Sequence, residues 1–237
     1  RKRDRAHELR AGLGDEGVVM CHINVISGIE NPPAPDRDYK DLDDVVSQLR
    51  SEKAIFVWNH PWACEQWEPG AKNFMGIELF NDVQSNGNFD NTKRIFMNSV
   101  RNGAKPFVIS GIDIHSMIQT TMGEVTTYVF PREFSRDSFL AALKAGHTVA
   151  AFNSKLFYLN VKPSLEPVVL SDGQVKIEAT VGIKPGSGAK ASLTVYKDGV
   201  EFTPAPPAVF ERGPKAEKGY TAYDISFTDK LAPGASA

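Results

Sequence analysis

Apolar segments up to about residue 150 alternate between strand-like and helix-like spacing. Runs rich in β-branched and aromatic residues predict strands over 18–26, 54–60, 75–80, 107–112 and 125–130. Apolar positions three and four apart predict helices over 41–49, from 91 or 92 to 103, and over 135–146, and the charged start predicts one over 4–10. Strands that alternate with helices are typical of parallel strands joined by crossover helices. We therefore expect an α/β fold, either a barrel or an open sheet.

The pattern changes after residue 155. Short alternating strands separated by turn residues are predicted over 157–161, 175–179, 191–196 and 223–227. This part carries no cluster of catalytic residue types, so we interpret it as a small antiparallel accessory domain of β-sandwich type. The expected domains are 1–155 and 156–237, and the second stops as if a further strand should follow.

Composition narrows the class of protein. With 237 residues, 41% hydrophobic content and a formal net charge of −2, the chain has the make-up of an ordinary soluble globular protein, and nothing favours nucleic acid or a membrane as a partner.

Two free thiols are expected at Cys21 and Cys64, with a disulfide between them as the alternative. The chain opens without Met and without a signal peptide, so we expect a fragment. Its localisation is unknown, with the periplasm and secretion left open.

Polar side chains follow two of the predicted strands where these strands end. Asp113 and His115 are two apart after an apolar run, so on a strand they would point to the same side. His60 ends an earlier strand, and Pro61 predicts an extended backbone there. Ligands gather at the carboxyl ends of parallel strands, and carboxylate and imidazole groups hold divalent metals. The sequence therefore predicts a metal site, although a lone strand-end histidine is often only structural.

Other candidates surround these residues. His22 lies in a strand, where a ligand and a core histidine are equally good interpretations. Glu78 and Asn81 end the strand after His60 and either orient ligands, touch substrate or cap the strand. Trp58 and Trp62 either form the wall of a substrate pocket or pack the loop at His60.

Taken together, these segments resemble the PHP superfamily (polymerase and histidinol phosphatase) of metal-dependent hydrolases, and in particular its carbaryl-hydrolase-like branch. The resemblance covers about residues 12–155 and rests on the segments 21–25, 59–61, 76–81 and 110–115. It implies a distorted seven-stranded β/α barrel that holds two or three divalent metal ions, zinc, manganese or iron. It also implies the metal ligands His22, His60, Asp113 and His115.

The chain departs from this family in two respects, at the first histidine motif and at the central glutamate. Family members open with a His-x-His motif, which is absent here, and Glu16 is the one nearby candidate for their central glutamate. We therefore expect the first part of the barrel to lie upstream or on another chain.

The resemblance implies hydrolysis of a small molecule by a metal-activated water. Asp113 would serve as a ligand and proton acceptor, and either His115 or a histidine of the missing barrel segment would protonate the leaving group. The tryptophan-rich loop favours an ester, carbamate or amide, with substrate contacts from Trp58, Trp62, Glu78 and Asn81. The alternatives are a phosphoesterase of the same superfamily and a non-catalytic binding protein with a degenerate metal site.

Overall fold

The structure is a computed structural model that describes residues 6–11, 21–26, 46–47, 54–81, 86–113, 125–152, 156–162, 168–169, 174–183, 193–204, 209–212 and 221–230. The chain contacts divide it into two compact units, Arg1–Ala151 (unit 1) and Phe152–Ala237 (unit 2). Both contain sheets, and the described helices lie in unit 1, so the chain has mixed α/β content.

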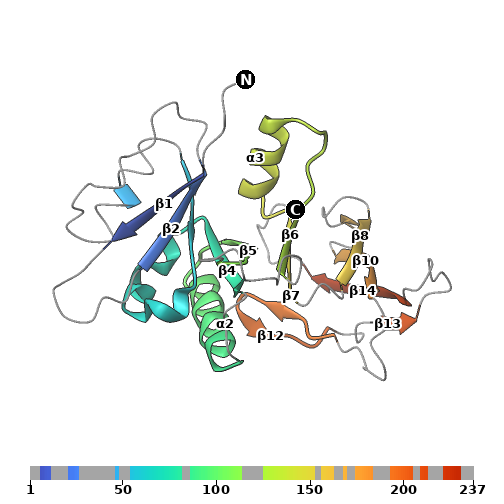
Figure 1. The fold of residues 1–237 in the computed structure, drawn as a ribbon. Helices are drawn as coiled ribbons and strands as arrows, with labels where there is room; N and C mark the ends of the chain where they lie inside the picture. The colour runs from blue at the N-terminus through green and yellow to red at the C-terminus, as the bar shows by residue number, and fades with distance from the viewer. Residues whose placement is uncertain are drawn as a thin grey trace. The chain divides into compact units, whose positions relative to one another are not determined.

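Unit 1 is built on a sheet of five strands in sequence order (Figure 1). These are β1 (Ala6–Ala11), β2 (Cys21–Ile26), β3 (Ile55–Trp58), β4 (Gly76–Asn81) and β5 (Phe107–Gly111). The pairings β3–β4 and β4–β5 are parallel, as the α/β pattern predicts. The pairings β1–β2 and β2–β3 are antiparallel, so the expectation of parallel strands is wrong for this half of the sheet.

The first strand also corrects the predicted helix over 4–10. Ala6 pairs with Ile26 and Ala11 with Cys21, which gives β1 a continuous antiparallel ladder along β2. Helix propensity is a weak preference of well under 1 kcal/mol per residue, and a ladder of this length overrides it.

Helical segments follow the strands of unit 1. They are the 3₁₀ helices η1 (Pro61–Ala63) and η2 (Glu65–Asn73) and the α-helices α2 (Asn86–Arg101) and α3 (Arg136–Lys144). Helix α2 begins earlier than the predicted 91 or 92, and Gly103 follows its end at φ 85°. Of the predicted helix over 41–49, only Val46 and Ser47 are described, and both are helical.

The capping of α3 agrees with the sequence. The Ser138 N–H donates to the Ser135 Oγ at 3.2 Å, so Ser135 is the N-cap, as predicted. Leu143 is buried, as predicted, but Phe139, also predicted to face inward, is 40% exposed because it belongs to the exposed first turns of the helix.

Strands β6 (Val125–Val129) and β7 (Thr148–Phe152) form a separate two-stranded sheet. Side-chain hydroxyls join it to β5: the Ser110 N–H donates to Thr127 Oγ1 at 2.7 Å, and the Val108 N–H donates to Thr148 Oγ1 at 3.2 Å. The described strands of unit 1 thus belong to separate sheets, and no closed barrel is formed among them.

Aromatic side chains fill one side of the sheet. Trp58 stacks on Phe74 with ring centroids 5.1 Å apart, and Trp67 stacks on Phe74 at 6.2 Å. Trp58 and Trp67 are buried, together with Ile23 of β2 and Ile95 of α2. The segment after β3 is therefore anchored by tryptophans that belong to the core.

Polar contacts hold η2 against α2. Arg94 forms ion pairs with Glu68 at 2.6 Å and with Glu65 at 3.3 Å, and the Asn98 amide donates to the other Glu68 oxygen at 2.6 Å. Partial burial raises the pKa of Glu68, but the hydrogen bonds from Asn98 and Arg94 and the charge of Arg94 outweigh it, so the pKa lies below its ordinary value.

We expect Arg94→Ala to lower the free energy of unfolding by less than about 1 kcal/mol at pH 7, because the pair is partly exposed. A carboxylate whose pKa is lower in the folded than in the unfolded state stabilises the fold at pH values above its unfolded-state pKa. This stabilisation is lost as the pH falls through the folded-state pKa. The difference between wild type and Arg94→Ala should therefore shrink below about pH 4.3. Urea titrations at pH 7 and in acid measure it, with Lys105→Ala as a surface-cation control. A difference that does not change with pH would contradict this account.

Unit 2 contains an antiparallel sheet in the order β13-β14-β10-β8, with β9 paired to β10. Its strands are β8 (Leu156–Lys162), β9 (Val168–Val169), β10 (Gln174–Ile183), β13 (Val209–Arg212) and β14 (Thr221–Lys230). The predicted strands over 157–161, 175–179 and 223–227 lie within β8, β10 and β14.

The remaining predicted strand of unit 2, over 191–196, is mostly wrong. Residues 193–195 are not in a strand, and β11 (Tyr196–Lys197) pairs only with β12 (Val200–Glu201). Asp198 and Gly199 between them have φ values of 52° and 75°, as in a tight hairpin turn with positive φ at both central residues.

In the parts of both units that the structure describes, none of the helices has the length and apolar character needed to cross a membrane.

Candidate functional site

Two buried histidines meet at the end of the antiparallel pair β2–β3. The Asn59 N–H donates to the His22 carbonyl at 3.1 Å, which extends the ladder one step beyond the Ile23–Trp58 pair. His60 then follows directly, and its Nε2 lies 3.0 Å from the Nδ1 of His22. The two residues are 7% and 3% exposed. One of the two nitrogens carries the proton of this hydrogen bond.

The backbone of His60 is left-handed, at φ 29° and ψ 61°. The predicted extended conformation is therefore wrong. His60 is the turning point between β3 and η1: Pro61 opens the helix, and the Ala63 N–H donates to the His60 carbonyl at 2.9 Å. A non-glycine residue in this region costs on the order of 1–3 kcal/mol, so surrounding contacts must hold it.

Glu78 supplies one of these contacts. Its Oε2 accepts the backbone N–H of His60 at 2.7 Å and the Nδ2–H of Asn81 at 3.2 Å. Glu78 is 4% exposed and Asn81 is 1% exposed. Both lie on β4, the strand beside β3 in the sheet.

A β-bulge in β4 explains how Glu78 and Asn81 meet. Residues three apart on a regular strand point to opposite faces. In β4 the register with β5 shifts between Glu78 and Phe80, because Glu78 pairs with Ile109 while Phe80 pairs with Ser110. The extra residue brings the side chains of Glu78 and Asn81 to the same side, in keeping with the frequent occurrence of bulges beside functional sites.

Asp113 joins this group through Asn81, whose Nδ2 lies 3.4 Å from Asp113 Oδ2. Strand β5 ends at Gly111, and Asp113 has a left-handed φ of 49°. The expectation that Asp113 and His115 share one side of a strand is therefore wrong, since Asp113 lies beyond the strand. His115 itself, like Glu16, lies outside the described residues.

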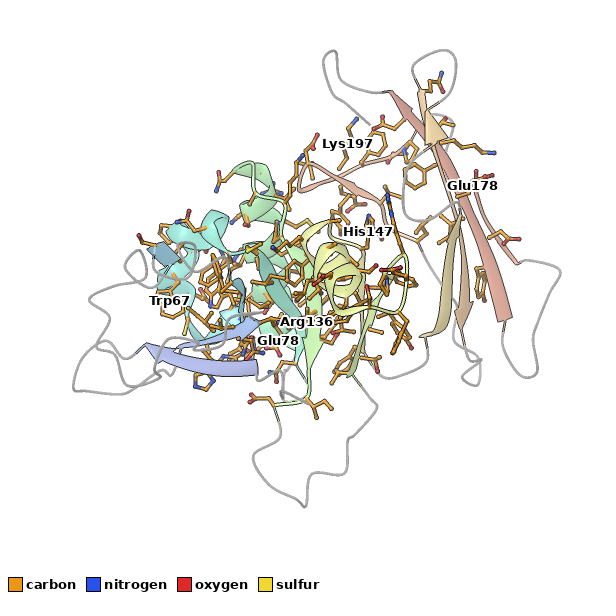
Figure 2. The ribbon with its side chains drawn as sticks, turned by 90° about the horizontal axis from the view of Figure 1, so that it is seen from above. Trp67, Glu78, Arg136, His147, Glu178 and Lys197 are labelled. Atoms are coloured by element: carbon orange, nitrogen blue, oxygen red, sulfur yellow. The ribbon has the colours of Figure 1, made fainter. Side chains whose placement is uncertain are left out.

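These contacts define the strand-end cluster, which consists of His22, His60, Glu78, Asn81 and Asp113. Gly111 lies beside this cluster, and the sequence pattern predicted no role for it. A Cβ built on Gly111 would overlap Glu78 Oε1, so the absence of a side chain allows Glu78 to lie against the β5 backbone. A glycine inside a strand pattern was the available signal for such a close approach. Figure 2 labels Glu78 among the strands of unit 1.

The residue types of the strand-end cluster suit a metal ion, but their positions do so only in part. Two nitrogens bound to one metal at about 2.0–2.1 Å lie roughly 3 Å apart when neighbouring, which is the separation of His22 Nδ1 and His60 Nε2. However, within the described ranges no three His, Cys, Asp or Glu residues are grouped closely enough to hold a metal ion. The predicted ligand His115 is not among those residues.

The two tryptophans expected at the substrate lie differently. Trp62 is half-buried, and its ring centroid lies 6.1 Å from that of His60. Trp58 is 0% exposed and stacks within the core, where it has no surface to offer a ligand. Trp62 is therefore the tryptophan of the two that a molecule at His60 could touch.

Cysteine usage also differs from the expectation of two free thiols, because Cys64 is disulfide-bonded. The sequence has one other cysteine, Cys21. Cys64 lies between η1 and η2, is fully buried, and follows His60 by four residues. The sequence alone could not favour the bond because Cys21 and Cys64 are far apart in the chain, and only the pairing of β2 with β3 brings these segments together.

We expect that iodoacetamide will not label either cysteine of the unfolded, unreduced protein, and that it will label both after reduction. Intact-mass measurement counts the labels. In Cys64→Ser the remaining cysteine should be labelled without reduction, which controls for reactivity. Two labels on the unreduced wild type would contradict the disulfide.

Comparison with protein-family models, with curated proteins and with solved structures finds no match to this chain.

Proposed function

We propose that this chain is part of a metal-dependent hydrolase of the PHP type, and that the strand-end cluster is its active centre. The observation that carries the proposal is the buried contact of 3.0 Å between His22 Nδ1 and His60 Nε2. Two imidazole nitrogens that converge here, with the Glu78 carboxylate on β4 and the Asp113 carboxylate just beyond β5, supply the ligand types used by zinc, manganese and iron.

In this proposal some residues of the strand-end cluster hold the metal and others orient these ligands. His22 and His60 would hold the metal, together with Asp113 and, as the resemblance implies, His115. Glu78 would orient His60 through its backbone, and Asn81 would orient the Asp113 carboxylate. A divalent metal ion supplies an activated water at neutral pH and polarises the scissile carbonyl or phosphoryl oxygen.

The substrate class is proposed from the surroundings of His60. Trp62 offers an aromatic surface beside the His60 ring, which favours an apolar ester, carbamate or amide over a phosphoester. A phosphoester would favour cationic groups at the site. The disulfide at Cys64 favours an oxidising compartment such as the periplasm or the cell exterior.

Metal content tests the proposal most directly. Plasma mass spectrometry on the purified protein, with intact mass from the same sample, should find bound zinc, manganese or iron that is lost in His60→Gln. Rates on an aryl carbamate and on p-nitrophenyl phosphate then separate the two substrate classes.

The absence of a three-ligand group among the described residues favours one alternative, a non-catalytic binding protein with a degenerate metal site. We expect a polypeptide of these residues alone to bind metal poorly, because the first part of the barrel is expected to lie upstream or on another chain. A metal-free protein that is confirmed by intact mass to begin upstream of Arg1, and that was supplied with zinc, manganese and iron, would support that alternative and overturn the hydrolase.

A further inference from the structure

A small cavity in unit 1 involves none of the residues of the strand-end cluster. Its volume is about 230 Å³. It is lined by Phe130, Arg132, Ser138 and His147 together with three alanines, Ala141, Ala142 and Ala145. The cavity opens to the surface, since Arg132, Ala141 and Ala145 are exposed, so we ask what it could bind.

The alanines leave the space open. Ala141 and Ala142 lie in α3, and Ala145 is its C-cap. The alanines have only methyl side chains, and Phe130, which directly follows β6, is a further apolar residue of the lining. A larger side chain at Ala141 would fill the cavity.

His147 is held at this cavity by its backbone. Its N–H donates to the Ala142 carbonyl at 2.9 Å, and the Gly146 N–H donates to the Leu143 carbonyl at 3.0 Å. With Gly146 at φ 74°, these bonds form a Schellman motif at the end of α3. The His147 carbonyl also accepts the Phe130 N–H at 3.0 Å, so His147 is fixed between α3 and the end of β6. Figure 2 shows His147 beside α3.

Three polar groups complete the cavity. Arg132, an exposed residue of the lining, carries a permanent cation with a fork of donors that matches a carboxylate. The imidazole of His147 offers a further donor, and the Ser138 hydroxyl has one proton to donate while its oxygen accepts the Glu133 N–H at 3.2 Å. The acidic groups in the neighbouring sequence are Glu133, whose carboxylate accepts the Ser135 hydroxyl at 2.9 Å, and Asp137.

We propose that this cavity binds a small monocarboxylate with an apolar body, of about the size of benzoate. The alanines and Phe130 would cover the apolar body, and Arg132, His147 and Ser138 would receive the carboxylate. The volume is below the roughly 300–1,000 Å³ of pockets for drug-sized ligands, so the ligand has few heavy atoms. This site is independent of the proposed hydrolase.

The test is an NMR titration of the whole chain with benzoate, and with the uncharged analogue benzamide as the comparison. Benzoate should shift the amide signals of Ser138, Ala142 and His147 and saturate in the millimolar range, as expected of so small a ligand. Benzamide should bind at least about tenfold more weakly, because it lacks the charge that Arg132 recognises.

Two variants and a control locate the binding. Arg132→Gln should weaken benzoate at least about tenfold, and Ala141→Leu, a change that helix propensity tolerates, should abolish binding by filling the cavity. Arg136→Gln, on the same helix but not lining the cavity, should bind as the wild type does. The proposal is overturned if benzamide binds as well as benzoate, if Arg132→Gln has no effect, or if the three amides do not shift. The result for Ala141→Leu is used only if the circular dichroism spectrum of this variant matches that of the wild type. If the spectra differ, the result for Arg132→Gln decides the test.

Discussion

Replacing Asp113 with asparagine should lower hydrolysis by at least about a hundredfold, if the strand-end cluster is the active centre. Loss of a group that merely orients a ligand typically costs 10- to 100-fold in metal affinity or activity, and loss of a ligand should cost no less. Asparagine suits this position because it tolerates the left-handed backbone of Asp113 at φ 49°, so the charge is removed without added strain. Turnover of an aryl carbamate and metal content measure the effect.

Asp90→Asn is the matched control for this experiment. Asp90 is an exposed residue of α2, outside the strand-end cluster, and its substitution removes the same charge. We expect activity and metal content as in the wild type. Full activity in Asp113→Asn would remove Asp113 from the proposed catalytic residues, whereas equal losses in both variants would point to an effect of net charge.

The second large effect is expected at Gly111, where an added methyl group meets the Glu78 carboxylate. Gly111→Ala should lower the free energy of unfolding by about 1–3 kcal/mol, the usual cost of overpacking a tight site. Glu78 can relieve the overlap only by moving, and it then loses the hydrogen bond to the His60 N–H. Chemical denaturation measures the stability, and metal content reports whether His60 is disturbed.

Gly87 provides the control, because a Cβ there has nothing within 4 Å and the residue lies in α2. Gly87→Ala should leave stability unchanged or raise it by up to about 1 kcal/mol. A double-mutant cycle isolates the contact: in a Glu78→Ala background, Gly111→Ala should cost much less than in the wild type. An equal cost in both backgrounds would show that Glu78 is not what the new methyl group meets.

Hydrophobic spacing predicted β3, β4 and β5 because each is a short apolar run rich in β-branched and aromatic residues. It also predicted the cap of α3, since Ser135 precedes the first apolar position of that helix. It failed at β1, whose charged sequence suits a helix and whose strand conformation depends on pairing with β2. Local pattern carries no information about a partner strand.

The candidate site could be predicted as a set of residues but not as a geometry. His60 and Asp113 were found because they follow apolar runs. Their left-handed backbones were not expected, nor was the bulge that turns Glu78 and Asn81 to one side, because each depends on contacts between separate strands.

The hydroxyl contacts of β5 have a consequence for how this protein behaves at high concentration. Among the described strands, β5 lies at the end of the five-stranded sheet, and a strand in that position can recruit a strand from another molecule. The N–H groups of Val108 and Ser110 are already bonded to Thr148 and Thr127, so those donors are not free to start such a pairing. The hydroxyls of Thr127 and Thr148 thus protect this edge from pairing with another molecule. We expect that removing either hydroxyl would expose one N–H donor of β5 and increase aggregation.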